Sequence, residues 1–271
     1  MTTAAAADSL PYTAQAIKAT ALLAETKALL RAWRPGESRA QLARRARSEA
    51  LLGKATASRS DDVVANAFAR RFLAGARPAA PALQRLLAER APGQWFTDLC
   101  LLYAARADAV LRDAVCIYAA ERRAMDQHWL DTPSLMRFLE DQQAAGRMAR
   151  PWSDSVKERV AQHVLRQMTD LGLAGPNRRG VRELLPFAPS GIAVAWLAYE
   201  LHCQGCSDAA VTAHRDWQLW TLHEPNLRER LALLARPELW EIQAAGSVVQ
   251  ITWACTTWEE AVDALARIDL R

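Results

Sequence analysis

Residues 152–185 constrain the fold most strongly, because a one-sided apolar pattern is followed there by a turn-rich basic segment. Apolar side chains recur at positions 156, 160, 164, 168 and 171, a spacing that keeps them on one side of an α-helix. Gly172 comes directly after this pattern, where glycine commonly ends a helix. The segment therefore predicts an amphipathic helix over residues 155–171 whose apolar side faces a core.

The start of this helix is predicted at Ser155. Glu158 follows three residues later, which is the spacing of a capping box, where each side chain satisfies a free backbone N–H. His163 lies on a flank of the helix, where it either contacts phosphate or has an ordinary packing role. The polar side opposite the apolar stripe is predicted to expose Ser155, Arg159, Gln162, Arg166 and Thr169.

A basic turn is predicted after the helix. Turn-forming residues surround Arg178 and Arg179, and a short strand can return from Val181. Another helix is expected to end at Gly146, before the amphipathic one. Two helices followed by a basic hairpin are typical of a winged helix-turn-helix, whose second helix enters the DNA major groove while the wing touches the backbone.

The charge of this region supports a nucleic-acid surface. Residues 147–182 include eight basic and three acidic residues, a local charge of +5 in a chain whose net charge is +4. Duplex DNA binds proteins largely through neutralisation of its phosphates. The alternative is a solvated helix face beside an arginine-rich loop. The predicted DNA-binding residues are Arg150, Ser155, Arg159, Gln162, Arg166, Arg178, Arg179 and Arg182.

A second basic cluster lies in residues 31–47, which include six arginines and one glutamate. It either extends the nucleic-acid footprint or solubilises the outer faces of two helices, since separation along the chain does not fix distance in space. After it, Ser60 is predicted to cap a helix that runs to Phe72. The possible second patch comprises Arg39, Arg44, Arg45 and Arg47.

The composition favours helices, because Ala, Leu and Arg are abundant and only 11 of the 271 residues are glycine. The predicted fold class is mainly α: a multi-helical globular protein with winged helix-turn-helix-like units and one or two short β-hairpins. Alternating apolar residues over 240–253 predict one hairpin. We expect an N-terminal helical subdomain (1–122), a winged unit (123–206) and a C-terminal helical unit with a hairpin (207–271), unless all form one compact domain.

The C-terminal unit repeats the outline of helices followed by a hairpin, with the opposite charge. Residues 221–260 include three arginines and six glutamates, so phosphate would be repelled there. This unit is therefore expected to pack within the protein or to meet another protein.

Candidate chemistry is sparse. No phosphate-binding loop, dinucleotide fingerprint, zinc-protease motif or nucleophile elbow occurs, so we expect no enzyme, no catalytic residue and no cofactor. Cys203 and Cys206 lie beside His202 and could hold zinc, but a lone C-x-x-C at a helix end favours ordinary thiols, and no metal is predicted.

The remaining patterns concern the compartment. Five unevenly spaced cysteines indicate no disulfide framework and fit a reducing cytoplasm. No secretory signal is expected at the N-terminus. The most apolar run, residues 188–199, is too short to cross a bilayer, so no membrane segment is predicted.

Four segments, in the same order, resemble the BrxA family of accessory proteins from BREX bacteriophage-exclusion operons. They are LLGKATASRSDDVVANAFARRFL, WSDSVKERVAQHVLRQMTDLGL, AYELHCQGCSDAAVTAHRDWQLWTL and AGSVVQITWACTTWEEAVDAL. The resemblance covers most of the chain from about Leu51 onward and is weaker in the first sixty residues.

The resemblance implies a cytoplasmic, almost entirely helical protein that binds double-stranded DNA, works beside other BREX proteins in antiviral defence and has no established catalytic activity. The family carries no catalytic motif that could be transferred to this chain, so the contact residues rest on the charge pattern alone. Two alternatives remain. One is an RNA-binding, antitermination-like protein, and the other is a scaffold of the defence complex.

Overall fold

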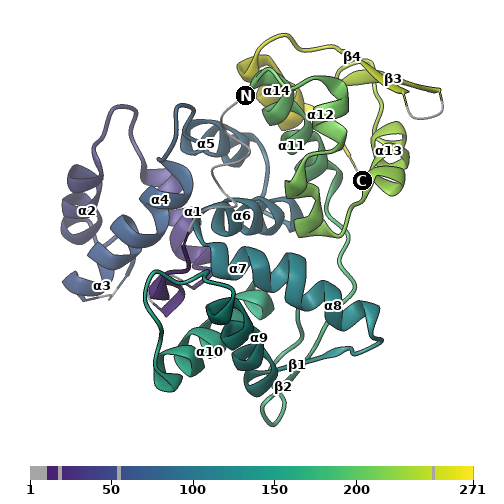
Figure 1. Ribbon diagram of the computed structural model, residues 1–271. Helices are drawn as coiled ribbons and strands as arrows, with labels where there is room; N and C mark the ends of the chain where they lie inside the picture. Colours follow the sequence, from purple (N-terminus) through teal and green to yellow (C-terminus); the bar gives the residue numbers. More distant parts are fainter. Residues whose placement is uncertain (1–10, 18–19, 54–55, 246–247, 271) are drawn as a thin grey trace. The chain divides into compact units, whose positions relative to one another are not determined.

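The protein is mainly helical, as predicted, and the strands in the described part of the chain form two small antiparallel pairs (Figure 1). No helix among the described residues is both long and apolar enough to cross a bilayer. This computed structural model describes residues 11–17, 20–53, 56–245 and 248–270.

Close contacts divide the chain into two units, which comprise residues 1–79 with 100–187 and residues 80–99 with 188–271. Each unit consists of two separate stretches of sequence, and helix α6 (Gln94–Ala107) is divided between them. The three consecutive segments expected from the sequence are a different division, and they stay a prediction.

The first unit consists of helices and one short strand pair. In chain order its elements are η1 (Ala14–Ile17), α1 (Leu23–Ala32), α2 (Arg39–Ser48), α3 (Ala57–Asp62), η2 (Val63–Phe68), α4 (Ala69–Phe72), the second part of α6, α7 (Ala109–Asp113), η3 (Ala114–Tyr118), α8 (Ala119–Ala124), β1 (Trp129–Asp131), α9 (Thr132–Ala144), α10 (Asp154–Asp170) and β2 (Val181–Glu183).

Helices α3, η2 and α4 form one continuous helix with a π-helical turn in the middle. It begins at Ala57, because the Thr56 hydroxyl accepts a hydrogen bond from the backbone N–H of Arg59 at 3.2 Å. The prediction that Ser60 caps this helix was wrong, since Ser60 lies buried inside it. The earlier start places Arg59 within the first helical turn.

Helix α10 buries the apolar side that the spacing predicts: Val160, Val164 and Met168 are fully buried, and Leu171 is buried just after the last turn. The helix ends as predicted at Gly172, which adopts φ 78°. The backbone N–H of Leu173 then donates to the carbonyl of Met168 at 2.8 Å, an arrangement that satisfies a carbonyl left open at the helix end.

The predicted capping box at Ser155 and Glu158 was wrong. Helix α10 begins one residue earlier, at Asp154, and Ser153 holds the N-cap position without a side-chain hydrogen bond. The carboxylate of Glu158 instead accepts a hydrogen bond from the Gln162 amide at 3.2 Å, across one turn of the helix. Ser155 therefore lies inside the helix as an exposed residue.

A small sheet connects the ends of this region. Strand β1 precedes α9 and pairs antiparallel with β2, with Leu130 opposite Arg182. Leading into β2, the chain turns through Arg179 and Gly180, and Arg178 and Val181 exchange both backbone hydrogen bonds across the turn. The short strand from Val181 is confirmed, whereas β1 was missed because three residues give too little pattern. The resulting order is helix, strand, helix, helix and hairpin.

Tyr12 fastens the first described residues to the connection between α9 and α10. Its hydroxyl donates to Oδ2 of Asp113 at 2.7 Å, and Nη2 of Arg147 donates to the same oxygen at 2.8 Å. The Arg147 guanidinium lies 5.2 Å from the centre of the Tyr12 ring. Burial, followed by the Asp113 charge, raises the pKa of Tyr12, so the hydroxyl remains a donor.

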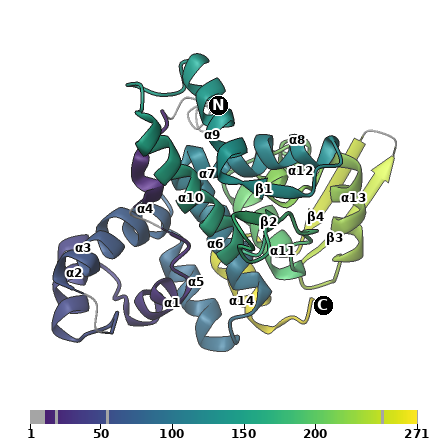
Figure 2. The same ribbon diagram turned by 90° about the horizontal axis from the view of Figure 1, so that it is seen from below.

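The second unit contains the longer hairpin (Figure 2). Trp240 pairs with Trp253, which confirms the hairpin predicted over 240–253. Asp208 supports this hairpin, because its carboxylate accepts from the backbone N–H of Ile251 at 2.8 Å and from Nε1 of Trp253 at 3.1 Å. The other elements are α5 (Ala80–Glu89), the first part of α6, α11 (Gly191–Cys203), α12 (Asp208–Thr212), η4 (Arg215–Trp220), α13 (Glu224–Leu233), β3 (Trp240–Ala245), β4 (Val248–Trp253) and α14 (Trp258–Arg267).

Replacing Tyr12 by Phe tests the fastening of the α9–α10 connection. The variant removes one donor from the buried Asp113 carboxylate and leaves Arg147 in place, so we expect a loss of about 1–2 kcal/mol in the free energy of unfolding. Urea denaturation followed by circular dichroism measures it. An unchanged midpoint would show that the hydroxyl contributes nothing.

Candidate nucleic-acid interface

The polar side of α10 presents the side chains that the sequence predicts. Ser155, Arg159, Gln162 and Arg166 are all exposed, at spacings that place them along one side of the helix. Thr169 differs, because it is only half-exposed and its hydroxyl donates to the carbonyl of Gly175 at 3.0 Å. Thr169 therefore stabilises the exit from the helix.

Arg178 and Arg179 are exposed at the turn that follows α10. Arg179 and Gly180 have φ angles of 54° and 89°, the positive pair required by a two-residue type I′ hairpin turn. The Asn177 side chain accepts from the backbone N–H of Gly180 at 2.9 Å and fixes this geometry. The turn is therefore short, has a fixed backbone conformation and exposes two guanidinium groups.

Arg182 lies differently from its neighbours at the turn. It is half-buried, and its Nε is buried with no hydrogen-bond partner in the described part of the chain. Burial lowers the pKa of Arg182, while the nearby carboxylate of Asp170 acts in the opposite direction. The same burial raises the pKa of Asp170. Arg182 is thus less accessible to a ligand than Arg178 and Arg179.

Several of the basic residues counted between 147 and 182 already face carboxylates. Lys157 has a side chain only 8% exposed, with its Nζ 3.0 Å from Asp154 and 3.4 Å from Glu140. Arg147 is held by Asp113. Arg166 has a looser partner, because its Nε lies 3.8 Å from Oδ2 of Asp170 and its side chain remains 70% exposed. The positive surface therefore depends chiefly on the exposed residues Arg150, Arg159, Arg166, Arg178 and Arg179.

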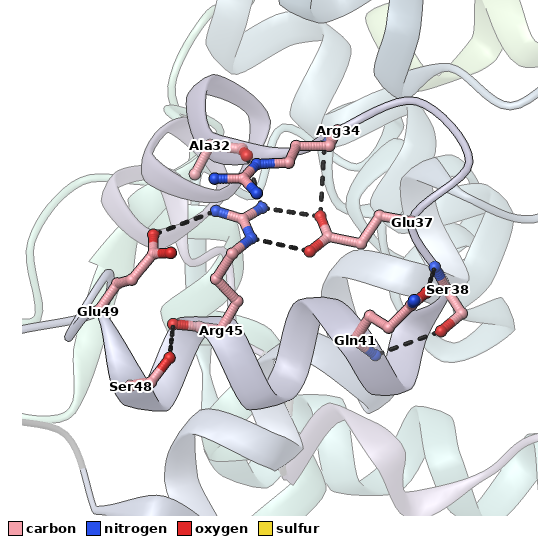
Figure 3. Close-up of polar contacts among 8 residues, drawn as sticks. All are labelled: Ala32, Arg34, Glu37, Ser38, Gln41, Arg45, Ser48 and Glu49. Carbon is pink, nitrogen blue, oxygen red and sulfur yellow. Dashed lines mark hydrogen bonds and ion pairs between the residues drawn. The ribbon is translucent and has the colours of Figure 1, made fainter.

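In the second basic cluster, Arg45 has a structural role. Figure 3 shows the Arg45 guanidinium between Glu37 and Glu49. Its Nε and Nη2 donate to the two carboxylate oxygens of Glu37 at 2.8 and 2.7 Å, and Nη2 also donates to the carbonyl of Ala32 at 2.6 Å. This fork-to-carboxylate contact holds the loop between α1 and α2 against α2.

The other members of the cluster differ in availability. Arg47 pairs with Asp61 of α3 at 2.7 Å, which ties α2 to α3. Arg39 and Arg44 are exposed on α2. Of the predicted second patch, Arg39 and Arg44 are therefore exposed, Arg47 forms an ion pair between helices, and Arg45 belongs to a part-buried network.

Arg59 is a residue of this surface that the sequence did not predict. It lines a pocket of about 370 Å³ together with Arg166 and Asp170 of α10, Glu25 of α1 and residues 20–23. His163 lies on the same side of α10 as Arg159 and Arg166, four residues after one and three before the other. The Thr56 N-cap was the available signal, because it starts α3 early enough to include Arg59.

The second unit carries fewer available cations. On α13, Arg228 pairs with Glu224 and Arg230 donates to the carbonyl of Pro189, whereas Glu229 is exposed. The expectation that this unit avoids phosphate stays a prediction. His202, considered above as a zinc ligand, has its ring stacked on Trp253 with 4.3 Å between centroids. No cluster of three potential metal ligands occurs among the residues that the structure describes.

The fold and the surface define a mainly helical protein that exposes arginines on α10 and on the turn that follows it. The model of the BrxA family matches residues 10–191, and the chain belongs to this family of BREX-associated proteins. This confirms the resemblance given by the sequence.

The other comparisons concern the fold. The crystal structure of an uncharacterized protein from Magnetospirillum magneticum is similar, with a TM-score of 0.58 over 71% of this chain and 94% of that one. Its sequence is 16% identical, so the likeness describes the fold alone. No curated protein matches the chain.

Substituting the neighbouring residues Arg45 and Arg44 of α2 distinguishes an arginine with a structural role from one on the surface. Replacing Arg45 by Ala leaves the Glu37 carboxylate, whose side chain is 8% exposed, without its main partner, so we expect a loss of about 2 kcal/mol of stability. Replacing the exposed Arg44 by Ala should change stability by less than about 0.5 kcal/mol. Urea titrations of both variants measure the difference.

The same pair predicts a pH dependence. The hydrogen bond from Arg45 lowers the pKa of Glu37 in the folded protein. The ion pair therefore contributes its full stability above the ordinary pKa of 4.5, and this stability is lost as the pH falls through the lowered pKa of the folded state. The stability gap between wild type and the Arg45 variant should therefore narrow on acidification. A gap independent of pH would contradict the role of the ionised Glu37.

Proposed function

We propose that this protein is a double-stranded-DNA-binding accessory protein of a BREX-type antiviral defence system, with low sequence specificity. The observation that carries the proposal is the succession of α9, α10 and a tight basic turn, with exposed arginines on both α10 and the turn. Membership of the BrxA family supplies the BREX association. Contact with DNA is our inference from the surface.

The element order supports a winged helix-turn-helix. The continuous helix α7–α8 corresponds to the first helix of the motif, and β1 follows it and precedes α9. Helix α10 occupies the position of the recognition helix. The turn at Arg179 forms a short wing, and the strand after it, β2, pairs with β1. Residues 145–153 make a longer connection than the tight turn of a simple helix-turn-helix. The Tyr12 and Arg147 contacts compensate by fixing this connection.

The exposed residues divide into two roles. Arg159, Gln162 and Arg166 lie on one side of a helix, where they can reach into or across a groove. Arg178 and Arg179 sit at the tip of a rigid turn and are suited to phosphates, with Arg150 as a further backbone contact. Arginine and glutamine contact phosphate as readily as base edges, so strong specificity does not follow.

The proposal includes no catalytic step and no cofactor. The protein acts by holding duplex DNA near other BREX proteins, which contact the exposed acidic residues of the second unit, such as Glu229. The cytoplasm is the compartment in which such a task takes place.

Replacing Arg178 and Arg179 together by Ala tests the wing. We expect affinity to fall to a similar extent for unrelated duplexes, and the log–log salt dependence of binding to flatten by about one to two units, because two phosphate contacts are lost. Fluorescence anisotropy at several salt concentrations measures both quantities.

The matched control replaces Arg267, an exposed arginine of α14 in the second unit, by Ala and should leave binding nearly unchanged. A folded double variant with wild-type affinity and salt slope would refute the assignment of the wing. Competition by equal lengths of duplex DNA and structured RNA tests the ligand, because preferential displacement by RNA would favour the antitermination-like alternative.

A further inference from the structure

His163 and Arg59 form a feature that the winged-helix outline does not include. His163 is half-buried on α10, and its Nδ1 is buried with no hydrogen-bond partner among the residues described. A histidine on the rim of a basic surface can gain a proton when an anion approaches. Its surroundings therefore decide what it could bind.

Three arginines lie near enough to this histidine for their charges to act on it. Arg159 and Arg166 lie one turn before and one turn after it on the same side of α10. Arg59 comes from α3 and lines the same pocket as Arg166. Burial lowers the pKa of His163, and the charges of Arg159, Arg166 and Arg59 lower it further, in that order. The ring is consequently neutral at physiological pH while no anion is bound.

Two carboxylates limit where an anion could sit. Glu25 of α1 and Asp170 of α10 line the pocket with Arg59 and Arg166, so the charges inside the pocket roughly balance. Asp170 lies one turn beyond Arg166, on the side away from Arg159. Arg159, one turn before His163 on α10, adds a third guanidinium charge on the side of His163 away from Asp170.

We propose that Arg59, Arg159 and Arg166 surround His163 as a single phosphate-binding site, and that occupation by a backbone phosphate of DNA couples binding to uptake of a proton by the histidine. This rests on the proposed function for its ligand and extends it by a residue of α3 and by a dependence on pH. The site widens the contact surface from α10 towards α3.

The sign of the coupling follows from linkage. A bound phosphate dianion or diester offsets the three guanidinium charges and favours the imidazolium form, so it raises the pKa of His163. The affinity for phosphate then begins to increase as the pH falls through the pKa that His163 has in the complex. The increase is complete once the pH lies below the pKa of His163 in the free protein. A rise of one pKa unit corresponds to about tenfold in affinity.

The test measures binding of a short duplex by fluorescence anisotropy at about pH 6 and about pH 8, near and above the ordinary range of histidine. We expect the wild type to bind about three- to tenfold more tightly at the lower pH, and His163→Gln to lose most of that difference while staying folded. Arg59→Ala should weaken binding and reduce the salt slope by about one, with Arg59→Lys restoring most of the affinity.

The control again is Arg267→Ala, which removes the same charge from the second unit. If the Arg59 and His163 variants behave like this control while the wild type binds duplex, the site is refuted and the proposed function stands. Thermal melts exclude unfolding as the cause of a loss.

A second arm separates the site from the DNA proposal. The His163 ring resonances are titrated with pH by NMR in the absence and presence of inorganic phosphate. An upward shift of the His163 pKa with phosphate in the wild type, diminished in Arg59→Ala, supports the site even if duplex binding fails. No response to phosphate, together with a pH-independent duplex affinity, overturns it.

Discussion

The burial of one side of α10 is the constraint on which the proposed interface depends. Val160, Val164 and Met168 have no exposed surface, and each such side chain contributes about 1.5–3 kcal/mol when it leaves water. Rotating the helix would expose that stripe, so Arg159, Gln162 and Arg166 must point outward. The connection that leads into the helix is held in turn by a contact distant in sequence, because Tyr12 binds the backbone of Arg147 and the carboxylate of Asp113. The proposed interface thus requires a fixed support even though no strong sequence specificity is proposed for it.

Carboxylate partners decide which arginines can serve a ligand. Arg45 lies close to the exposed Arg44 in sequence, yet it is enclosed by Glu37, Glu49 and a backbone carbonyl, and its task is to hold a loop. Lys157 likewise forms ion pairs with Glu140 of α9 and Asp154 of α10. Net charge along a segment therefore overestimates the surface available to phosphate. Within residues 147–182 the effective positive surface is smaller than the count of basic residues and consists chiefly of Arg150, Arg159, Arg166, Arg178 and Arg179.

The sequence was sufficient for features that depend on local pattern. The period of α10, its end at Gly172 and the hairpin that begins at Trp240 all follow from residues close together in the chain. The start of α10 was predicted wrongly from a local pattern: Ser155 and Glu158 have the spacing of a capping box, yet the helix begins at Asp154 and Glu158 accepts a hydrogen bond from Gln162. Features set by distant contacts could not be predicted from local patterns at all. The Thr56 N-cap could place Arg59 in a helix but not at the site, since only the fold brings α3 to the pocket that Arg166 lines.

The most direct measurement is photocrosslinking from the proposed contact side of α10. The photoreactive residue p-benzoylphenylalanine is placed at Gln162, which is exposed on α10, and in a separate protein at Leu233, which is 61% exposed on α13 of the second unit. Each protein is irradiated with labelled duplex DNA, and crosslinked complexes are separated by denaturing electrophoresis. The account predicts a strong crosslink from position 162 and little from position 233. Equal crosslinking at both positions, or crosslinking only from position 233, would contradict it.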